Sequence, residues 1–305
     1  MEIKSVSIIG LGALGVLFGN HLASRMPKEN LRFIADEERI IKYKKDKVYC
    51  NGNSCEFNFV TPEEILKPAD LLIFAVKYSG LKDAISAVRN HVGENTIIIS
   101  VLNGITSEAI IGETYGMNKI LYCVAQGMDA VKEGNRLTYH NMGVLVIGDG
   151  EPGIKSENTM RLEDFFSKMD LPHEVDTSMK KRIFSKFMLN VGVNQTVAVY
   201  GSNYSIIHQE GIARDTMIAA MREVMYISEK EGINLTEDDI HYWLDILNKL
   251  SPDGKPSMRQ DIEAKRHSEV DLFSGTVIEF GKKHGIPTPV NQMLYDKIKE
   301  IENTY

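Results

Sequence analysis

The sequence predicts two domains, an amino-terminal doubly wound α/β domain and a carboxyl-terminal domain made only of helices. Two observations carry this prediction. As far as about residue 125, short apolar, β-branched runs alternate with amphipathic stretches, and beyond about residue 178 only helical periodicity remains. We therefore expect residues 1–177 to form the first domain and residues 178–305 to form the second.

The strands of the first domain are predicted where apolar residues follow one another almost without interruption, as in parallel strands buried on both faces. They are Ser5–Ile9, Leu31–Ala35, Leu71–Val76, Thr96–Val101 and Ile120–Ala125. Helices are expected between them, at Ala13–Ser24, Glu37–Tyr43, Leu81–His91 and Glu108–Tyr115. Two later pieces, Leu137–His140 and Val144–Ile147, are expected as antiparallel additions at the edge of the sheet.

The second domain shows long helical periodicity that is interrupted by glycine and proline turns. Apolar residues recur there at helical spacing, and the strand signals of the first domain are lacking. The predicted helices are Ser178–Val199, Gly211–Glu231, Thr236–Leu250, Met258–His284 and Val290–Asn303.

Composition narrows the class of protein. Of the 305 residues, 43% are hydrophobic and 25% are charged, which is the balance of a globular protein. The net charge of −7 argues against nucleic acid as a partner, because phosphate binding needs a basic surface. No apolar run is long enough to span a membrane and Met1–Ser5 has no signal-peptide character, so we expect a cytoplasmic protein. The three cysteines lack metal-ligand spacing, so we expect reduced thiols and no metal.

A glycine-rich turn follows the first predicted strand and opens the first predicted helix. In a dinucleotide site the first glycine makes a tight turn, the second admits a pyrophosphate, and the third packs helix against strand. The helix N-terminus then faces the phosphates with its partial positive charge. We predict a Rossmann-type cofactor site, with a glycine turn that binds no ligand as the alternative. Its residues are Gly10, Leu11, Gly12, Ala13, Leu14 and Gly15.

Asp36 follows the second predicted strand, where an acidic residue accepts hydrogen bonds from an unmodified adenosine ribose and favours NAD. Arg39, three residues later, is placed to meet a 2′-phosphate instead. A third interpretation makes Asp36 the N-cap of the helix Glu37–Tyr43. These residues alone therefore leave the choice between NADPH and NADH open.

Ligands of open parallel sheets bind outside the carboxyl ends of the strands, so residues at those ends are candidates for the site. Lys77 ends the strand Leu71–Val76, and Asn103 follows the strand Thr96–Val101. A lysine there offers a cation to a carboxylate or phosphate, and an asparagine amide can contact the nicotinamide side of the site. The alternative for each is a helix-capping or solvated residue.

Lys186, Asn190 and Asn194 recur at i, i+4 and i+8, which places them in one line along the helix Ser178–Val199. Their neighbours are apolar around most of the circumference, so this helix is expected to be buried. Buried amide and ammonium groups need partners, and a ligand pocket would supply them. The alternative is hydrogen bonding to the protein's own backbone. A partly buried lysine suits a proton donor.

Glu269 interrupts a helical stripe that otherwise reads as facing the core, made of Met258, Ile262, Lys265, Leu272, Thr276 and Phe280. A carboxylate is seldom buried without a cation or a ligand, and Lys186 is the candidate partner. Ser257, just after Pro256, is either the N-cap of this helix or a substrate-binding hydroxyl.

In combination these motifs resemble the ketopantoate reductase (2-dehydropantoate 2-reductase) family. The residues that carry the resemblance occur in the family's order over nearly the whole chain. They are the glycine-rich turn, Val76-Lys77, Asn103-Gly104, the Lys186/Asn190/Asn194 helix, Ser257-Met258-Arg259-Gln260-Asp261 and Ser268-Glu269-Val270-Asp271. Where well-known members carry an arginine at the end of the second strand, this chain has Asp36.

The resemblance implies a helical domain like that of 6-phosphogluconate dehydrogenase and an active site in the cleft between the domains. It also implies NADPH-dependent reduction of ketopantoate to (R)-pantoate, on the way to pantothenate and coenzyme A. Lys186 would be the general acid, and Glu269 would bind the substrate or position the lysine. The other implied roles are substrate binding by Asn190, Asn194 and Ser257, and places near the cofactor and the reacting carbonyl for Lys77 and Asn103.

Two other functions compete with this one. A β-hydroxyacid dehydrogenase also combines a Rossmann domain with a lysine–asparagine helix, but would act on another small 2-oxo or 3-hydroxy acid. A non-catalytic NADP(H) sensor would have no need of a buried Lys186 and Glu269. We expect a small 2-oxo acid as the partner, with no nucleic acid and no membrane; a homodimer is compatible with the sequence, which does not decide the oligomeric state.

Overall fold

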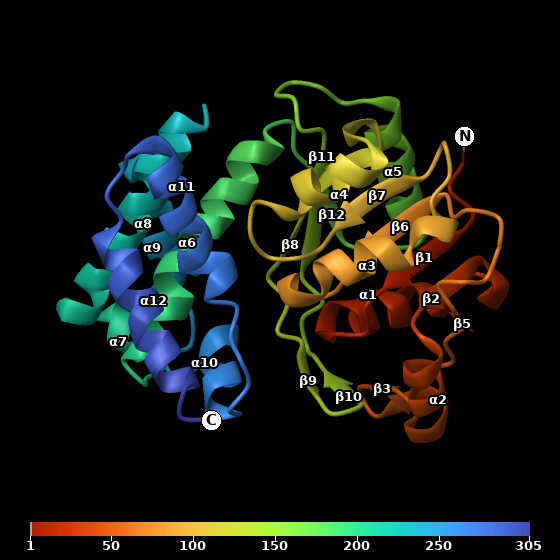
Figure 1. Cartoon of the computed structure of the whole chain (residues 1–305), viewed down its shortest axis with the longest axis horizontal. Coiled ribbons are helices and arrows are strands. Elements are labelled where there is room, and N and C mark those ends of the chain that lie inside the picture. Colours follow the sequence, from red (N-terminus) through yellow and green to blue (C-terminus); the bar gives the residue numbers. More distant parts are fainter. Residues whose placement is uncertain (1) are drawn as a thin grey trace. The chain divides into compact units, whose positions relative to one another are not determined.

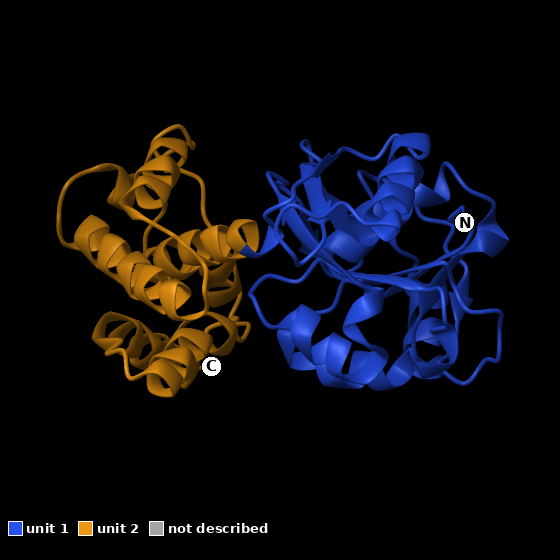
Figure 2. Ribbon diagram, turned by 90° about the horizontal axis from the view of Figure 1, so that it is seen from above, with its two compact units in different colours: residues 1–180 blue, residues 181–305 orange. Residues whose placement is uncertain are grey.

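The chain divides into two compact units, Met1–Lys180 and Lys181–Tyr305, in the computed structural model, which describes residues 2–305 (Figure 2). The first unit contains the strands and the second consists of helices (Figure 1). The predicted class, a doubly wound α/β part followed by an all-α part, is confirmed.

The main sheet of the first unit has eight strands in the order β12-β11-β8-β7-β6-β1-β2-β5 (Figure 1). From β5 to β8 the neighbouring strands are all parallel, and their order is that of a Rossmann sheet. Their bounds are β1 Val6–Ile9, β2 Leu31–Ile34, β5 Phe59–Val60, β6 Leu71–Phe74, β7 Ile97–Ser100, β8 Ile120–Gln126, β11 Val144–Gly148 and β12 His173–Val175. Residues of β1, β6 and β7 are all buried, as parallel strands between two helical layers must be.

Helices cover both faces of this sheet and form two apolar cores (Figure 1). One core joins the sheet to α1 (Ala13–Ala23) and α5 (Glu157–Lys168), and the other joins it to α3 (Leu81–Ala87) and α4 (Ser107–Tyr115). The helix after β2 is α2 (Glu37–Asp46). Short 3-10 turns connect the elements at Lys28–Asn30, Tyr78–Gly80, Arg89–His91 and Met117–Lys119.

A second, four-stranded sheet has the order β4-β3-β10-β9. Its strands are β3 Tyr49–Cys50, β4 Asn53–Ser54, β9 Val131–Glu133 and β10 Arg136–Thr138. The predicted edge strand Leu137–His140 is therefore wrong in its place, because β10 pairs with β3 and buries Leu137 in the core that contains α1. For the other predicted addition the antiparallel pairing is confirmed, since β11 runs antiparallel to β8, but the edge of the sheet is taken by β12, which runs parallel to β11.

The second unit begins with the long helix α6 and continues with shorter helices. Their bounds are α6 Met179–Val199, α7 Ser205–His208, α8 Ile212–Lys230, α9 Glu237–Leu247, α10 Ser257–Glu263, η5 Asp271–Gly275, α11 Thr276–His284 and α12 Pro289–Glu302. Four of the five predicted helices occur close to their expected bounds, as α6, α8, α9 and α12.

The fifth, Met258–His284, is wrong as one helix, because the chain leaves α10 after Glu263 and re-enters a helix only at Asp271, in the π-helical η5. Lys265 takes a left-handed φ of 51°, and the N–H of Arg266 bonds to the carbonyl of Asp261 at 2.9 Å, which closes α10. Glu302 of α12 then accepts hydrogen bonds from the backbone and the hydroxyl of Ser268 at 2.7 and 2.6 Å. Contacts with a distant helix thus override the local helical pattern.

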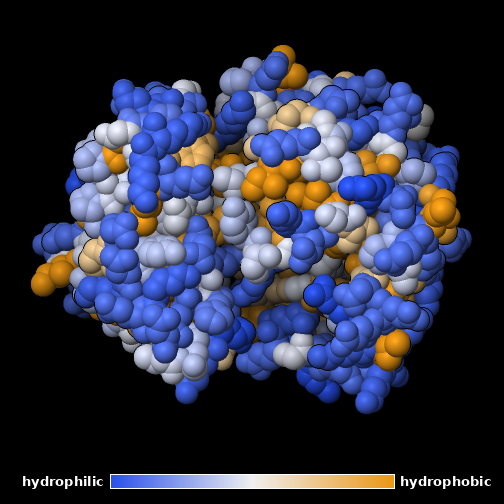
Figure 3. Space-filling model, viewed as in Figure 1, coloured by the Kyte–Doolittle hydropathy of each residue, from blue (hydrophilic) through white to orange (hydrophobic). Residues whose placement is uncertain are grey.

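On the side shown in Figure 3 the surface is mostly hydrophilic, and its hydrophobic residues gather in one area of the first unit and lie singly elsewhere. Among the helices of residues 2–305, none combines the length and the apolar character that crossing a bilayer requires.

Candidate active site

Three turns leave the main sheet at the carboxyl ends of neighbouring strands. Ile9 of β1 pairs with Phe74 of β6, and Phe74 pairs with Ser100 of β7, so the strands end at one level. The glycine-rich turn follows β1, Lys77 follows β6 and Asn103 follows β7. The strand order reverses at β1 and β6, which is where open α/β sheets bind ligands. The structure places Lys77 and Asn103 just after the ends of their strands, as predicted. Their contacts with a ligand stay predictions.

The glycine-rich turn is built so tightly that two of its glycines cannot carry a side chain. Gly10 has a φ of 101°, and a Cβ there would lie 2.5 Å from the carbonyl oxygen of Ala75. A Cβ on Gly15 would collide with the carbonyl oxygen of Gly10. At Gly12 the nearest protein atom to such a Cβ is the Ala75 oxygen at 3.6 Å, an ordinary contact. Packing within the protein therefore explains Gly10 and Gly15 but leaves space beside Gly12.

The space beside Gly12 adjoins the amino end of α1. Gly12 is the N-cap of α1 and gives the helix no side-chain hydrogen bond, and the first turn contains no acidic residue. The N–H groups at this helix end are thus available to an anion, and the helix dipole favours one. Ala13 and Leu14 belong to that first turn.

Asp36 is the N-cap of α2, so that interpretation of this residue is confirmed. Its Oδ1 accepts a hydrogen bond from the backbone N–H of Arg39 at 2.8 Å, and its Oδ2 lies 3.3 Å from Arg39 Nε. The two side chains are 53% and 70% exposed, so this ion pair contributes little stability and a stronger anion can displace the carboxylate. Asp36 therefore caps the amino end of α2, and its negative charge lies next to the positive charge of Arg39.

Glu108 is a buried carboxyl that sequence reasoning missed. It lies in the first turn of α4, just after the Asn103 turn, and is 3% exposed. Burial raises its pKa to about 7, although the hydroxyl of Ser107 donates a 2.9 Å hydrogen bond to its Oε2. A first-turn glutamate is usually an exposed helix-dipole partner, so the residue type at this place carried no signal of burial.

In the second unit, Lys186, Asn190 and Asn194 lie along one line of α6, as predicted. Apolar residues of this helix are mostly buried, while Lys186 and Asn190 are partly exposed and Asn194 is 6% exposed. The helix is anchored by other polar contacts as well, because the indole N–H of Trp243 donates to Ser185 Oγ at 2.8 Å. The polar line therefore opens to a partly accessible side of a largely buried helix.

Ser257 joins this polar line. Its hydroxyl donates to Asn194 Oδ1 at 3.0 Å, the backbone N–H of Met258 donates to the same oxygen at 3.2 Å, and Asn194 Nδ2 lies 3.4 Å from Asn190 Oδ1. The N-cap of α10 is Pro256, so the N-cap interpretation of Ser257 is wrong. The structure thus brings together three of the predicted substrate-binding residues, from α6 and α10.

Glu269 does not lie on a continuous helix, and the apolar stripe that singled it out is wrong. It lies in the bend before η5, partly exposed, where its backbone carbonyl accepts the N–H of Phe273 at 3.0 Å. The bend is held on one side by the Ser268–Glu302 hydrogen bonds and on the other by Asp271, which binds Lys299 at 2.8 Å. Glu269 is therefore carried by a fixed bend and not by a helix face.

Two family models match the chain. Residues 6–152 match the model described as "Ketopantoate reductase PanE/ApbA", and residues 178–302 match "Ketopantoate reductase PanE/ApbA C terminal". Curated relatives include a 2-dehydropantoate 2-reductase of Aquifex aeolicus, 24% identical over 97% of this chain and 96% of its own length. Another, from Vibrio cholerae, is 22% identical over 99% of both chains.

Solved structures of the same fold cover almost the whole chain. D-mandelate dehydrogenase, solved with NADH and anilino(oxo)acetate, has a TM-score of 0.87 at 22% identity and covers 98% of this chain and 99% of its own. A ketopantoate reductase of Ralstonia eutropha has a TM-score of 0.85 at 22% identity over 98% of this chain and 99% of its own.

Proposed function

The chain belongs to the ketopantoate reductase family, and from this premise we propose that it reduces 2-dehydropantoate to (R)-pantoate with a reduced nicotinamide cofactor. The observation that carries the proposal is the polar line of α6, in which Asn194 also binds Ser257 of α10. This line and Ser257 provide one cation, Lys186, and several uncharged hydrogen-bond donors. A small 2-oxo acid needs such groups to bind its carboxylate and its carbonyl oxygen. The glycine-rich turn supplies the cofactor site in the other unit.

In the proposed reaction the glycine-rich turn would hold a reduced nicotinamide cofactor, which would supply the hydride that C2 of the 2-oxo acid accepts. Lys186 donates a proton to the carbonyl oxygen, and as an ammonium it stabilises the negative charge that develops there. Asn190, Asn194 and Ser257 orient the substrate, and Glu269 binds the substrate or positions Lys186. The shared hydrogen bonds of Asn194 fix its amide before substrate arrives, which favours a productive geometry.

We propose NADPH as the preferred cofactor, with NADH as the alternative. The carboxylate of Asp36 caps α2 and pairs with Arg39. This pairing compensates part of its negative charge and so reduces its repulsion of a 2′-phosphate. The guanidinium of Arg39 is mostly exposed and can bind that phosphate. Lys77 and Asn103 are assigned to the cofactor and the reacting carbonyl, along with the glycine-rich turn Gly10, Leu11, Gly12, Ala13, Leu14 and Gly15.

The direct test is a steady-state assay of ketopantoate with each reduced cofactor, followed by the absorbance of the reduced nicotinamide. We expect turnover with ketopantoate and a higher kcat/KM with NADPH. Absence of turnover with either cofactor would contradict the proposal. Arg39→Ala should weaken NADPH binding about tenfold and leave NADH binding unchanged; equal affinities before and after the change would remove Arg39 from the phosphate site.

A second candidate is the reduction of a different 2-oxo acid, because a protein of this fold is a D-mandelate dehydrogenase. The same assay with phenylglyoxylate, and oxidation of a panel of 3-hydroxy acids, separates the candidates. A kcat/KM for phenylglyoxylate well above that for ketopantoate would favour the second candidate.

We further propose that residues 1–177 form the cofactor domain and residues 178–305 the substrate domain, and that the protein acts in the cytoplasm, in pantothenate and coenzyme A biosynthesis. A homodimer is proposed because a ketopantoate reductase of Staphylococcus aureus with the same fold is described as dimeric. Light scattering at several concentrations tests the dimer directly.

A further inference from the structure

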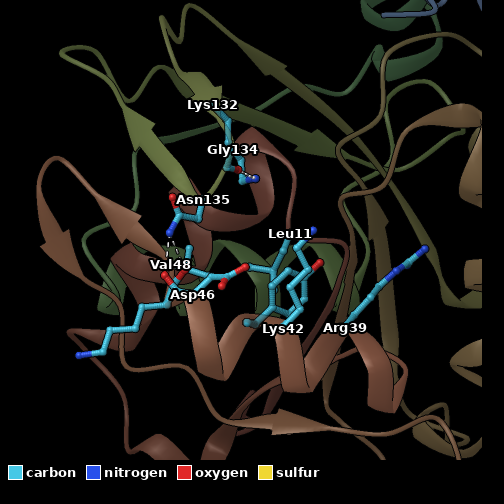
Figure 4. Close-up of a pocket in the computed structure, with 10 residues that line it drawn as sticks. Leu11, Arg39, Lys42, Asp46, Val48, Lys132, Gly134 and Asn135 are labelled. Atoms are coloured by element: carbon cyan, nitrogen blue, oxygen red, sulfur yellow. Dashed lines mark hydrogen bonds between the residues drawn. The ribbon is translucent and has the colours of Figure 1, made fainter.

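A cavity of about 680 Å³ lies beside the glycine-rich turn, within the first unit (Figure 4). Its wall includes Leu11 of that turn, Arg39 and Lys42 of α2, and Lys132 and Asn135 of the hairpin formed by β9 and β10. In Figure 4 Lys132 and Gly134 of the hairpin lie on one side of Leu11, and Lys42 and Arg39 of α2 lie on the other, while Asn135 contacts the end of α2. A ligand held by the glycine-rich turn can therefore extend between α2 and the hairpin.

The hairpin is fixed in this position by hydrogen bonds to the end of α2. The amide Nδ2 of Asn135 donates to the carbonyls of Asp46 and Lys47 at 2.7 and 3.2 Å, and the carbonyl of Asn135 accepts the N–H of Tyr49 at 2.9 Å. Lys132 is held in turn, since its Nζ donates to the carbonyl of Gly134 at 2.6 Å. The cavity is thus a built feature of the fold and does not depend on a loose surface loop.

The charge of the cavity wall suits an anion. Arg39, Lys42, Lys47 and Lys132 contribute four cations to the wall, and Asp46 contributes the carboxylate. Burial lowers the pKa of Lys132, and the positive charge of Lys42 lowers it further. Both ammonium groups line the same cavity, so a bound anion would be attracted to each of them.

The apolar part of the wall suits a purine. Leu11 and Tyr43 line the cavity, and the ring of Tyr43 is stacked on Phe59, with centroids 5.5 Å apart and planes at 25°. An adenosine phosphate combines an aromatic base with negative charge, so it matches both parts of the wall.

We propose that this cavity binds the adenosine end of the cofactor and that Lys132 and Lys42 hold its 2′-phosphate, so that the β9–β10 hairpin selects NADPH over NADH. The proposal rests on the cofactor site of the proposed function and adds residues from a sheet outside the Rossmann core. It explains how a chain with Asp36 after β2 can still form a positively charged phosphate site, because Lys42 of α2 is joined by one further cation, Lys132 of the hairpin.

The test compares two fragments that differ in the 2′-phosphate, 2′,5′-ADP and 5′-AMP, by isothermal titration calorimetry on the full chain without substrate. We expect wild type to bind 2′,5′-ADP more tightly. Lys132→Ala should weaken 2′,5′-ADP about tenfold, or about 1.4 kcal/mol, and change 5′-AMP less than about twofold. Lys132→Gln, which removes the charge but keeps most of the side chain, should give the same result.

Lys45→Ala is the matched control, because it removes one exposed positive charge from α2 at a residue outside the cavity wall. We expect it to change both affinities less than about twofold. The proposal is overturned if wild type binds the two fragments equally, or if Lys132→Ala weakens both fragments alike or neither. These outcomes are independent of ketopantoate turnover, so the proposed reaction can fail while the phosphate site stands, and the reverse.

Discussion

The candidate site residues of the two units are of different kinds. In the first unit the glycine-rich turn is a backbone site, shaped by strands in register and by glycines within six residues of one another. In the second unit the site is made of side chains, and Ser257 binds an asparagine 63 positions away in the sequence. A backbone site is damaged by adding atoms, whereas a side-chain site is damaged by removing them. Substitutions of both kinds therefore test the comparison.

The largest effect is expected from Lys186→Ala. Loss of a general acid lowers kcat by at least about a hundredfold, and up to about ten-thousandfold, because the developing alkoxide loses both its proton source and its stabilising charge. Cofactor binding should be nearly unchanged, since the glycine-rich turn lies in the other unit. Turnover above about half that of wild type would remove Lys186 from the role of proton donor.

Buried carboxyls extend the comparison to pH. Glu223 of the second unit accepts hydrogen bonds from the backbone N–H groups of Val290 and Asn291 and from the Asn291 amide, at 2.8, 2.9 and 2.7 Å. The side chain of Glu108 in the first unit accepts a hydrogen bond from the Ser107 hydroxyl at 2.9 Å, and burial raises its pKa from 4.5 to about 7. A raised pKa favours folding with the carboxyl protonated, so this contribution is complete below about pH 4.5 and is lost as the pH rises to about 7.

Glu108→Gln should remove that dependence. Relative to the variant, the free energy of unfolding of wild type should fall between about pH 4.5 and pH 7, by on the order of 3 kcal/mol at most. Urea unfolding of both proteins at several pH values measures the difference. A difference that stays constant with pH would mean that Glu108 titrates at its ordinary pKa.

Within the glycine-rich turn, Gly15→Ala and Gly12→Ala should separate folding from binding. A methyl group at Gly15 meets the Gly10 carbonyl, so we expect a loss of about 2 kcal/mol of stability, within the usual range for an overpacked site. A methyl group at Gly12 has room in the protein and should leave the melting temperature nearly unchanged while it weakens cofactor binding. Equal stability losses in both variants would show that the space beside Gly12 is not kept for a ligand.

The smallest effect is expected from Glu269→Ala. Because the carboxylate is assigned to the substrate, KM for the 2-oxo acid should rise roughly tenfold, with a smaller change in kcat. Steady-state kinetics at varied substrate concentration measures both. If Glu269 is instead a structural ion-pair partner of Lys186, a thermal melt will show a large loss of stability and the folded variant will have normal kinetics.

Much of the fold can be predicted because its strands are buried on both faces and therefore read as continuous apolar runs. β1, β6 and β7 begin and end within two residues of their predicted bounds. β3, β4 and β5 have two residues each, too few for any periodic pattern. α5 was missed although it carries a readable signal, a Ser156 N-cap followed by apolar residues at helical spacing.

The candidate site likewise has a part that local sequence patterns indicate and a part that depends on packing between distant segments. The glycine motif and the line of Lys186, Asn190 and Asn194 are local patterns, so the sequence alone indicates them. The contact between Ser257 and Asn194 depends on how α10 packs against α6, and no local pattern encodes it. Lys132 was missed for the same reason, since Gly134-Asn135 indicates a hairpin but not its position beside α2.

The hydrogen bonds between Ser268 and Glu302 have a consequence for the order in which the protein matures on the ribosome. Synthesis runs from the amino end, so the bend that carries Glu269 emerges before α12 exists to hold it. Until Glu302 follows, the bend lacks the acceptor for both the backbone and the hydroxyl of Ser268. The nascent chain can therefore complete its glycine-rich turn well before the bend that carries Glu269 is held in place.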